Sequence, residues 1–267
     1  MRSQGLRVAG SQVATSQGCR VMRQKFRAGL TGLLLALFCA TASAQTPSVD
    51  EIVNKALTVR GGLDKLRAVN TMKMVGKVTM QGREFPITVM AKRPNLMLQE
   101  MTIDGTRVVS AFDGEKVWVV NPMLGINEPQ AMTGAMADEI RDQSIFDGPL
   151  VGYKDRGETL ELVGPNTVGD VKTWKLKLTR ADGRTMFIDV DAATGFEIQW
   201  SRRVDQGGMN VDVDSLMSDY QPTDRGIVVP RTMRTIIGGH QQGLLKVDSV
   251  TFDAPIDDAA FQMPKPQ

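Results

Sequence analysis

The feature that most constrains this chain is the change of period that begins after Asn70. From Met72 to Met80 apolar residues alternate with polar ones, which is typical of a strand with one buried face. Similar short segments recur to the C-terminus, separated by turn pairs such as Asp104-Gly105 and Asp113-Gly114. This spacing predicts one mainly β, antiparallel domain of about ten or eleven strands, as a meander, sandwich or barrel rather than a βαβ fold.

Two segments interrupt the β pattern with helical signals. Ser48 followed by Glu51 is a capping-box arrangement and predicts a short helix that ends at Arg60-Gly61-Gly62. Within 128–146 the spacing predicts an amphipathic helix with two faces. Its apolar face would carry Met132, Met136 and Ile140, and its polar face Asp138, Glu139, Arg141 and Asp142.

The first 44 residues are typical of a secretory signal peptide. They contain six basic residues and no acidic one, then an apolar run from 28 to 40, and they end in Ala42-Ser43-Ala44. The apolar run is shorter than the roughly 20 residues that span a bilayer. We therefore expect export to the periplasm, cleavage after Ala44 and a single domain over 45–267, with Met22 as a candidate functional start.

Cleavage after Ala44 would leave a chain poor in catalytic parts. Cys19 and Cys39 would be lost, the net charge would become −4, and His240 would be the one histidine. A His- or Cys-based metal site, a Ser-His-Asp triad and a phosphate-binding loop all lack their residues. We expect no enzyme activity, cofactor, metal or nucleic-acid partner.

Paired carboxylates are the remaining catalytic candidates. Asp189 and Asp191, and likewise Asp212 and Asp214, stand on one face of a predicted strand because alternate residues point the same way. They could form an acid/base pair or a Ca²⁺ site. A solvated strand face is the interpretation we favour.

Methionine is unusually abundant, with 16 residues in the chain. Methionine side chains are flexible and polarisable, which suits a surface that accepts ligands of varied shape. A curved sheet closed by a methionine-faced helix would enclose an adaptable apolar cavity, although ordinary core packing explains the pattern equally well. The candidate lipid-binding residues of the cavity and lid are Met72, Met74, Met90, Met97, Trp118, Met132, Met136 and Ile140.

One stretch resembles the LolA family of periplasmic lipoprotein carriers. It consists of Lys92-Arg93-Pro94-Asn95-Leu96 followed by Asp113-Gly114, Trp118 and Asn121-Pro122, with looser similarity to the C-terminus. The resemblance implies a half-open, strongly curved antiparallel β-barrel whose open side is plugged by helices. It also implies that Arg93 latches the lid, for which five guanidinium donors are well suited. Ser110 stands where the family has an apolar leucine that faces the cavity.

The resemblance favours a non-catalytic periplasmic carrier of lipid or lipoprotein acyl chains, acting in outer-membrane lipoprotein or lipid sorting. It adds an inner-membrane transporter and an outer-membrane acceptor as candidate partners, and we expect a monomer. An envelope sensor or scaffold that binds a protein partner is the alternative, and a carboxylate hydrolase is a third hypothesis.

Overall fold

The strands of this protein form one antiparallel sheet. The structure, a computed structural model, describes residues 46–206 and 208–265, so the predicted signal peptide and Met22 lie outside the described residues. The sheet has 13 strands in the order β6-β5-β4-β3-β2-β1-β13-β12-β11-β10-β9-β8-β7. They are β1 (Thr71–Met80), β2 (Arg83–Lys92), β3 (Leu96–Ile103), β4 (Thr106–Phe112), β5 (Val117–Asn121), β6 (Ile126–Met132), β7 (Thr159–Val168), β8 (Val171–Thr179), β9 (Thr185–Asp191), β10 (Glu197–Gln206), β11 (Met209–Pro222), β12 (Val228–Ile237) and β13 (His240–Phe252).

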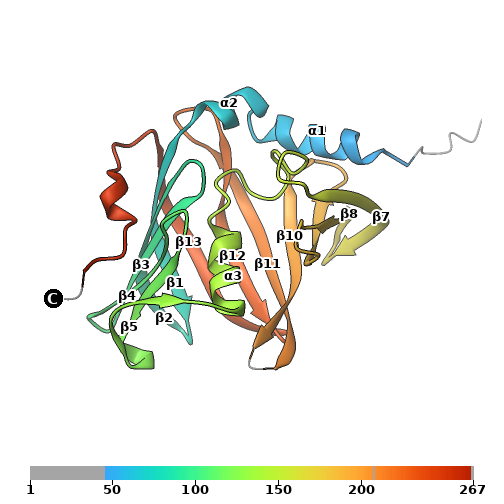
Figure 1. Ribbon diagram of the computed structural model, residues 1–267. Coiled ribbons are helices and arrows are strands. Elements are labelled where there is room, and N and C mark those ends of the chain that lie inside the picture. The colour runs from blue at the N-terminus through green and yellow to red at the C-terminus, as the bar shows by residue number, and fades with distance from the viewer. Residues whose placement is uncertain (1–45, 207, 266–267) are drawn as a thin grey trace, which may run out of the picture. The chain divides into compact units, whose positions relative to one another are not determined.

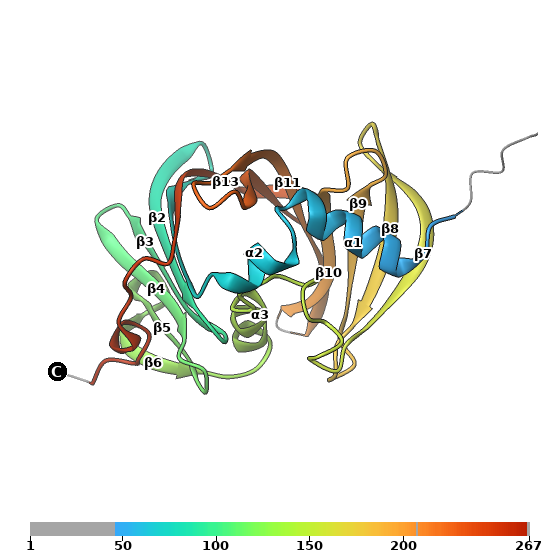
Figure 2. The ribbon, with the colours of Figure 1, turned by 90° about the horizontal axis from the view of Figure 1, so that it is seen from above.

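The sheet is two meanders joined along one seam. On one side of the seam, β1 to β6 are neighbours in sequence order, with β6 at the edge of the sheet. On the other side, β13 to β7 are neighbours in reverse sequence order, with β7 at the opposite edge. The seam is the antiparallel pairing of β1 with β13, which places Met72 opposite Phe252. Seen from above in Figure 2, the sheet curls around a concave inner face, and its two edge strands, β6 and β7, are not paired with each other. The mainly β, half-open barrel expected from the resemblance is confirmed, although it has 13 strands rather than the predicted ten or eleven.

Three α-helices lie on the inner side or the rim of the curled sheet (Figures 1 and 2). They are α1 (Val49–Val59), α2 (Leu63–Ala68) and α3 (Ala135–Gln143), and two 3₁₀ turns occur at Pro122–Leu124 and Asp258–Ala260. Ser48 caps α1 through the predicted capping box with Glu51. Among the described residues no helix combines the length and the apolar character that a membrane-spanning helix requires.

The inserted helix is shorter than predicted, because the first part of the predicted segment is the strand β6. Pro129 has no amide hydrogen to donate, so it is poorly suited to a helix interior but tolerated on an edge strand. β6 pairs with β5, with Met132 opposite Val117, and Gly134 (φ 75°) turns the chain before α3 begins. Met132 therefore lies on a strand, and only Met136 and Ile140 of the predicted helical face belong to α3.

The largest core lies between the helices α1 and α2 and the strands β7 to β10, β12 and β13. Its centre is fully buried, with Leu176, Leu178 and Ile188 each 0% exposed. Ile52, Val53, Ala56 and Leu57 of α1 and Leu66 of α2 pack onto it, together with Leu150, Val151 and Tyr153 from the segment after α3. We call this cluster the closed core.

The link between α1 and α2 is fixed to the sheet by close backbone contact. The Val228 amide donates to the Arg60 carbonyl (3.0 Å), and a Cβ on Gly61 would stand 2.5 Å from the Gly226 carbonyl oxygen. Beside it, burial raises the pKa of Glu197, although the Arg60 charge and a 2.8 Å bond from Trp200 Nε1 oppose the shift. These contacts hold α1 and α2 in place over the closed core.

Candidate functional site

The candidate site is the inner face of β1 to β6, which α3 covers. The apolar side chains there come from alternate positions of each strand, because neighbouring residues point to opposite faces. We call this set the inner apolar surface; it comprises Met74, Val78, Ile87, Val89, Met97, Met101, Phe112, Val117, Val119, Met132 and Leu245. Ala137 (1% exposed) and Ile140 (8%) of α3 pack against it. In this structure the helix therefore covers the inner apolar surface.

Two polar residues interrupt the inner apolar surface. Gln99 of β3 and Ser110 of β4 are directly opposite each other, and each shares the face of the methionine or phenylalanine two positions away, Met97 and Phe112. Both are partly exposed. Ser110, which stands where the LolA family has an apolar leucine, thus lies on the surface beneath α3.

The eight predicted binding residues divide into four groups. Met74, Met97, Met132 and Ile140 meet on the inner apolar surface, whereas Met72 is on the same face of the sheet but packs against the closed core. Met90 and Trp118 lie on the outer face, and Met136 is 51% exposed on α3. The predicted grouping is therefore corrected for Met90, Trp118 and Met136.

Trp118 and Met90 are on the outer face because each stands one position from a residue that points inward. The C-terminal segment crosses that face outside β3 and β4 in Figure 2 and covers them. Phe261 is 0% exposed there, and its carbonyl accepts a 2.8 Å bond from Trp118 Nε1. Where this segment covers β3 to β5 both faces of the sheet are buried, so apolar residues there do not reveal from the sequence which of them face inward.

The polar face of α3 is attached to the other half of the sheet by ion pairs. Glu139 accepts hydrogen bonds from Arg202 of β10, one of them 2.9 Å long. Asp142 accepts from Arg184 at 2.6 Å and 3.0 Å and lies 3.4 Å from Arg180. The helix therefore bridges the open side of the barrel, with its apolar face on one half and its acidic face on the other.

The two acidic groups of α3 respond differently to their surroundings. Burial acts to raise the pKa of Glu139, but hydrogen bonds and charge from Arg202, aided by Gln143 and Arg184, lower it below its usual value. Burial raises the pKa of Asp142 in spite of Arg184 and Arg180. Glu139 is accordingly the carboxylate whose charge is best stabilised at this contact.

A cleft of about 320 Å³ lies beside these ion pairs, between α3 and strands β9 to β11. Its walls are mostly charged, with Asp138, Glu139 and Asp142 from α3 facing Arg184, Arg202 and Arg203 from the strands. On this side α3 therefore adjoins charged side chains, whereas on the side that faces β1 to β6 it adjoins the inner apolar surface.

Arg93 connects three parts of the chain at the top of the barrel. Its Nε donates to the Val69 carbonyl (2.7 Å) and its Nη2 to the Leu66 carbonyl (2.9 Å), both at the end of α2. Both terminal nitrogens also donate to Asp147 at 2.6 Å, and the guanidinium lies 4.7 Å from the Phe146 ring centroid. A single side chain therefore joins the β2–β3 turn, α2 and the segment that follows α3.

Asp189 and Asp212, one member of each carboxylate pair, have different surroundings. Asp189 is 0% exposed and accepts 2.8 Å bonds from Asn166 and Thr173, so the predicted solvated face is wrong at this position. Asp212 is exposed and pairs with Arg203 (3.0 Å), as a solvated face predicts. Among the described residues no group of three or more His, Cys, Asp or Glu side chains could hold a metal ion.

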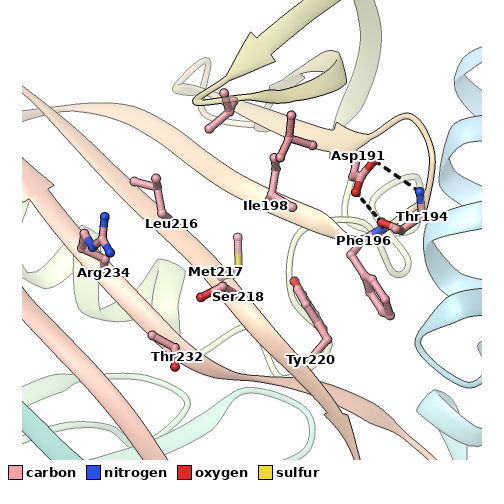
Figure 3. Close-up of a pocket in the computed structure, with 12 residues that line it drawn as sticks. Asp191, Thr194, Phe196, Ile198, Leu216, Met217, Ser218, Tyr220, Thr232 and Arg234 are labelled. Carbon is pink, nitrogen blue, oxygen red and sulfur yellow. Dashed lines mark hydrogen bonds between the residues drawn. The ribbon is translucent and has the colours of Figure 1, made fainter.

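A second cavity, of about 520 Å³, lies on the outer face between the β7–β8 hairpin and strands β10 to β12. Figure 3 shows Leu216 and Ser218 of β11 and Thr232 and Arg234 of β12 along its wall. Phe196 and Tyr220 stack at its end, with ring centroids 4.2 Å apart. The cavity is separate from the inner apolar surface, because the sheet lies between them.

Comparison with known proteins identifies this architecture. No protein-family model and no curated protein matches the sequence. Among solved structures, a LolA superfamily protein from Nitrosomonas europaea is similar, with a TM-score of 0.53 and 14% identity over 82% of this chain and 98% of that one. A DUF1329 family protein from Desulfovibrio piger gives 0.52 and 14%, over 81% of this chain and 98% of that one.

A third similar structure is a putative outer membrane lipoprotein-sorting protein domain from Vibrio parahaemolyticus. Its TM-score is 0.50 at 10% identity, over 79% of this chain and 94% of that one. Together the three define the class of fold as a half-open antiparallel barrel with helices in its opening. The chain has a LolA-like fold, and the resemblance seen in the sequence is confirmed at that level.

Proposed function

We propose that this protein is a non-catalytic carrier or binder of lipid or lipoprotein acyl chains. The observation that carries the proposal is the inner apolar surface, which is rich in methionine and covered by one nine-residue helix. Each CH₂ group moved from water onto such a surface contributes about 0.8 kcal/mol, so a lipid gains much by entering. The methionines can adapt to chains of different shape.

In this proposal α3 is a lid that competes with the cargo. Ala137 and Ile140 cover the inner apolar surface when it is empty, and an acyl chain would displace them. Arg93 would act as the latch, because it holds α2 and the Phe146-Asp147 segment in the closed arrangement. The ion pairs of Glu139 and Asp142 would provide the second attachment, which water can replace when the helix leaves.

The place of action follows from the predicted signal peptide. Cleavage after Ala44 would release the domain into the periplasm, where a lipid needs a carrier to cross an aqueous space. The likeness to the Vibrio lipoprotein-sorting domain supports a role in outer-membrane lipoprotein or lipid sorting, with a transporter and an acceptor in the two membranes as partners. Gln99 and Ser110 on the inner surface favour a cargo other than a triacylated lipoprotein.

The test is direct binding to the delipidated domain, residues 45–267. We expect a fluorescent fatty acid or a fluorescent lipopeptide to bind, and lipids extracted from freshly purified protein to be visible by mass spectrometry. Met74→Gln and Met101→Gln should weaken binding severalfold, because they place an amide among apolar groups. Met209→Gln is the matched control, since Met209 is 70% exposed. Failure of the unmodified domain to bind either probe would refute the proposal.

A second candidate is a sensor or scaffold that binds a protein of the cell envelope. Two observations favour it: α3 fills the inner surface, and the outer face carries a 520 Å³ cavity with both apolar and charged walls. In this case cross-linking in the periplasm should capture one protein partner, and Leu216→Asp in the outer cavity should abolish capture. If capture of the protein partner is instead lost in Met74→Gln and Met101→Gln and kept in Leu216→Asp, the result would favour the carrier.

A further inference from the structure

Arg231 of β12 is a partly exposed arginine with an unusual guanidinium group. Its Nε and Nη1 nitrogens are buried and have no hydrogen-bond partner. The side chain takes part in none of the ion pairs found in residues 46–206 and 208–265, whereas Arg93 and Arg202 each bind a carboxylate. Guanidinium nitrogens that are buried without a partner are costly, so two such donors on one side chain would be favourably paired with an anionic ligand.

The alternation of β12 shows which way Arg231 points. Thr232 and Arg234 line the cavity on the outer face, as Figure 3 shows. Arg231 and Met233 occupy the intervening positions and therefore face the interior of the barrel. Val229, two residues before Arg231, agrees with this direction because it is 8% exposed in the closed core.

The next inward-facing positions along β12 and β11 carry methionines. Met233 on its own strand is directly opposite Met217 of β11, which is 5% exposed. The carboxylate nearest in register is Asp219, between the pairs Ser218–Thr232 and Tyr220–Pro230. Asp219 is exposed and accepts a 2.9 Å bond from Gln221, so it leaves Arg231 without a counter-charge.

The position of Arg231 relates it to the inner apolar surface. β12 adjoins β13, which carries Leu245, and β13 adjoins β1, which carries Met74. Met233 is directly opposite Leu245 across the β12–β13 pair. An apolar path on one face of the sheet thus leads from beside the Arg231 guanidinium to the methionines beneath α3.

We propose that Arg231 binds the anionic head group, a carboxylate or a phosphate, of an amphiphile whose acyl chain lies along the inner apolar surface. This inference rests on the proposed function and names the ligand class of the same interior. A guanidinium fits either group, because it offers planar paired donors to two oxygens at once. Entry of the head group would supply the partners that Nε and Nη1 lack.

The test compares ligands that differ only in charge. The probes are oleate, a lysophosphatidic acid with the same acyl chain, and methyl oleate, each titrated into the delipidated domain. We expect at least one anionic probe to bind about 10- to 100-fold more tightly than the neutral ester, as charged hydrogen bonds usually give. Preference for oleate alone identifies a carboxylate, and preference for the lysophospholipid alone identifies a phosphate.

Two variants of Arg231 and one control locate the effect. Arg231→Gln and Arg231→Met should abolish the preference for the anion while leaving methyl oleate binding unchanged. Arg234→Gln removes the same charge three residues away on the outer face and should keep the preference. Because Arg231 has unpartnered nitrogens, Arg231→Met should retain or raise the thermal unfolding midpoint, whereas loss of a purely structural arginine would lower it.

The possible failures are distinguishable. If the unmodified domain binds oleate, the lysophospholipid and methyl oleate equally, the role of Arg231 is wrong but the carrier proposal stands. If the preference for an anionic probe over methyl oleate persists in both Arg231 variants, the role of Arg231 is again wrong and the carrier proposal again stands. If none of the three probes binds, the proposed function fails together with the inference.

Discussion

The two halves of the sheet are built differently. The half formed by β7 to β12 is sealed by α1, α2 and the segment after α3, and its central leucines and isoleucine have no exposed surface. The half formed by β1 to β6 has partly buried methionines on its inner side, where α3 covers it. In the proposed carrier the first half would be a permanent core and the second would have a removable cover, so stability and ligand binding would depend on different halves of the sheet.

The largest effect should come from the closed core. Leu176→Ala removes a side chain that is 0% exposed and should lower the free energy of unfolding by about 2–5 kcal/mol. Met74→Ala, on the partly buried inner surface, should cost about 1–2 kcal/mol because less area is buried there. Chemical denaturation of both variants measures the difference, and equal losses would contradict the division into two kinds of core.

The next effect should come from the arginine that joins α2 to the segment after α3. Arg93→Gln leaves Asp147 without its partner and should destabilise this contact by about 1.5–3 kcal/mol, the usual range for charged hydrogen bonds. Hydrogen exchange should become faster in α2 and α3 but not in β8 and β9. Uniformly faster exchange in all these elements would show that Arg93 supports the whole fold rather than the cover.

A smaller effect is expected from acidification. The pKa of Glu139 is lowered in the folded protein, so its contribution is fully present above the unfolded-state pKa and is lost as the pH falls through the folded-state value. Below about pH 4.5 the attachment of α3 to β10 should weaken by on the order of 1 kcal/mol.

The matched variant for this prediction is Glu139→Gln. Hydrogen exchange of α3 should become pH-dependent below about pH 4.5 in the unmodified protein, and this dependence should be reduced in the variant. Asp142, whose pKa is raised, is expected to change in the opposite sense, so the variant isolates the Glu139 contribution. An identical pH profile in the two proteins would show that Glu139 does not control the helix.

The smallest effect should be that of Met136. Because its side chain is 51% exposed on α3, Met136→Gln should change the free energy of unfolding by less than about 0.5 kcal/mol. Ile140→Gln, one turn later on the buried side, should cost clearly more. Thermal unfolding of the two variants compares an exposed and a buried position of the same helix, and a reversed order would mean that Met136 rather than Ile140 packs against the sheet.

The sequence predicted the fold well because it depends on patterns that are local. Alternation in β1 to β5 and the turn pairs between them require only neighbouring residues, and the Ser48–Glu51 cap is equally local. β6 was missed because a short edge strand with Pro129 can be read as the start of the amphipathic segment that follows. That error moved Met132 from a strand to a helix.

The site was predicted less well. Whether an apolar strand residue belongs to the inner apolar surface depends on the face of the sheet to which it points and on what covers the other face. Met90 and Trp118 are as apolar as the inner residues, and only the cover supplied by Phe261 reveals that they face outward. Arg202 and Arg231 were not singled out, since their roles arise from strand pairing far along the chain. The alternation within β12 could have placed Arg231 with Val229 and Met233 once that strand was predicted.

The pairing of β1 with β13 also orders the events by which the fold can form. Each meander grows by adding a strand to its immediate predecessor, with short loops and little loss of chain entropy. The seam is different, because Met72 must meet Phe252, which lies near the end of the chain. Because the polypeptide is synthesised from the N-terminus, one edge of β1 stays unpaired until the last strand, β13, has been made. A chain interrupted before β13 would therefore keep two separate sheets and no barrel, which makes the curved interior the last part of the molecule to be completed.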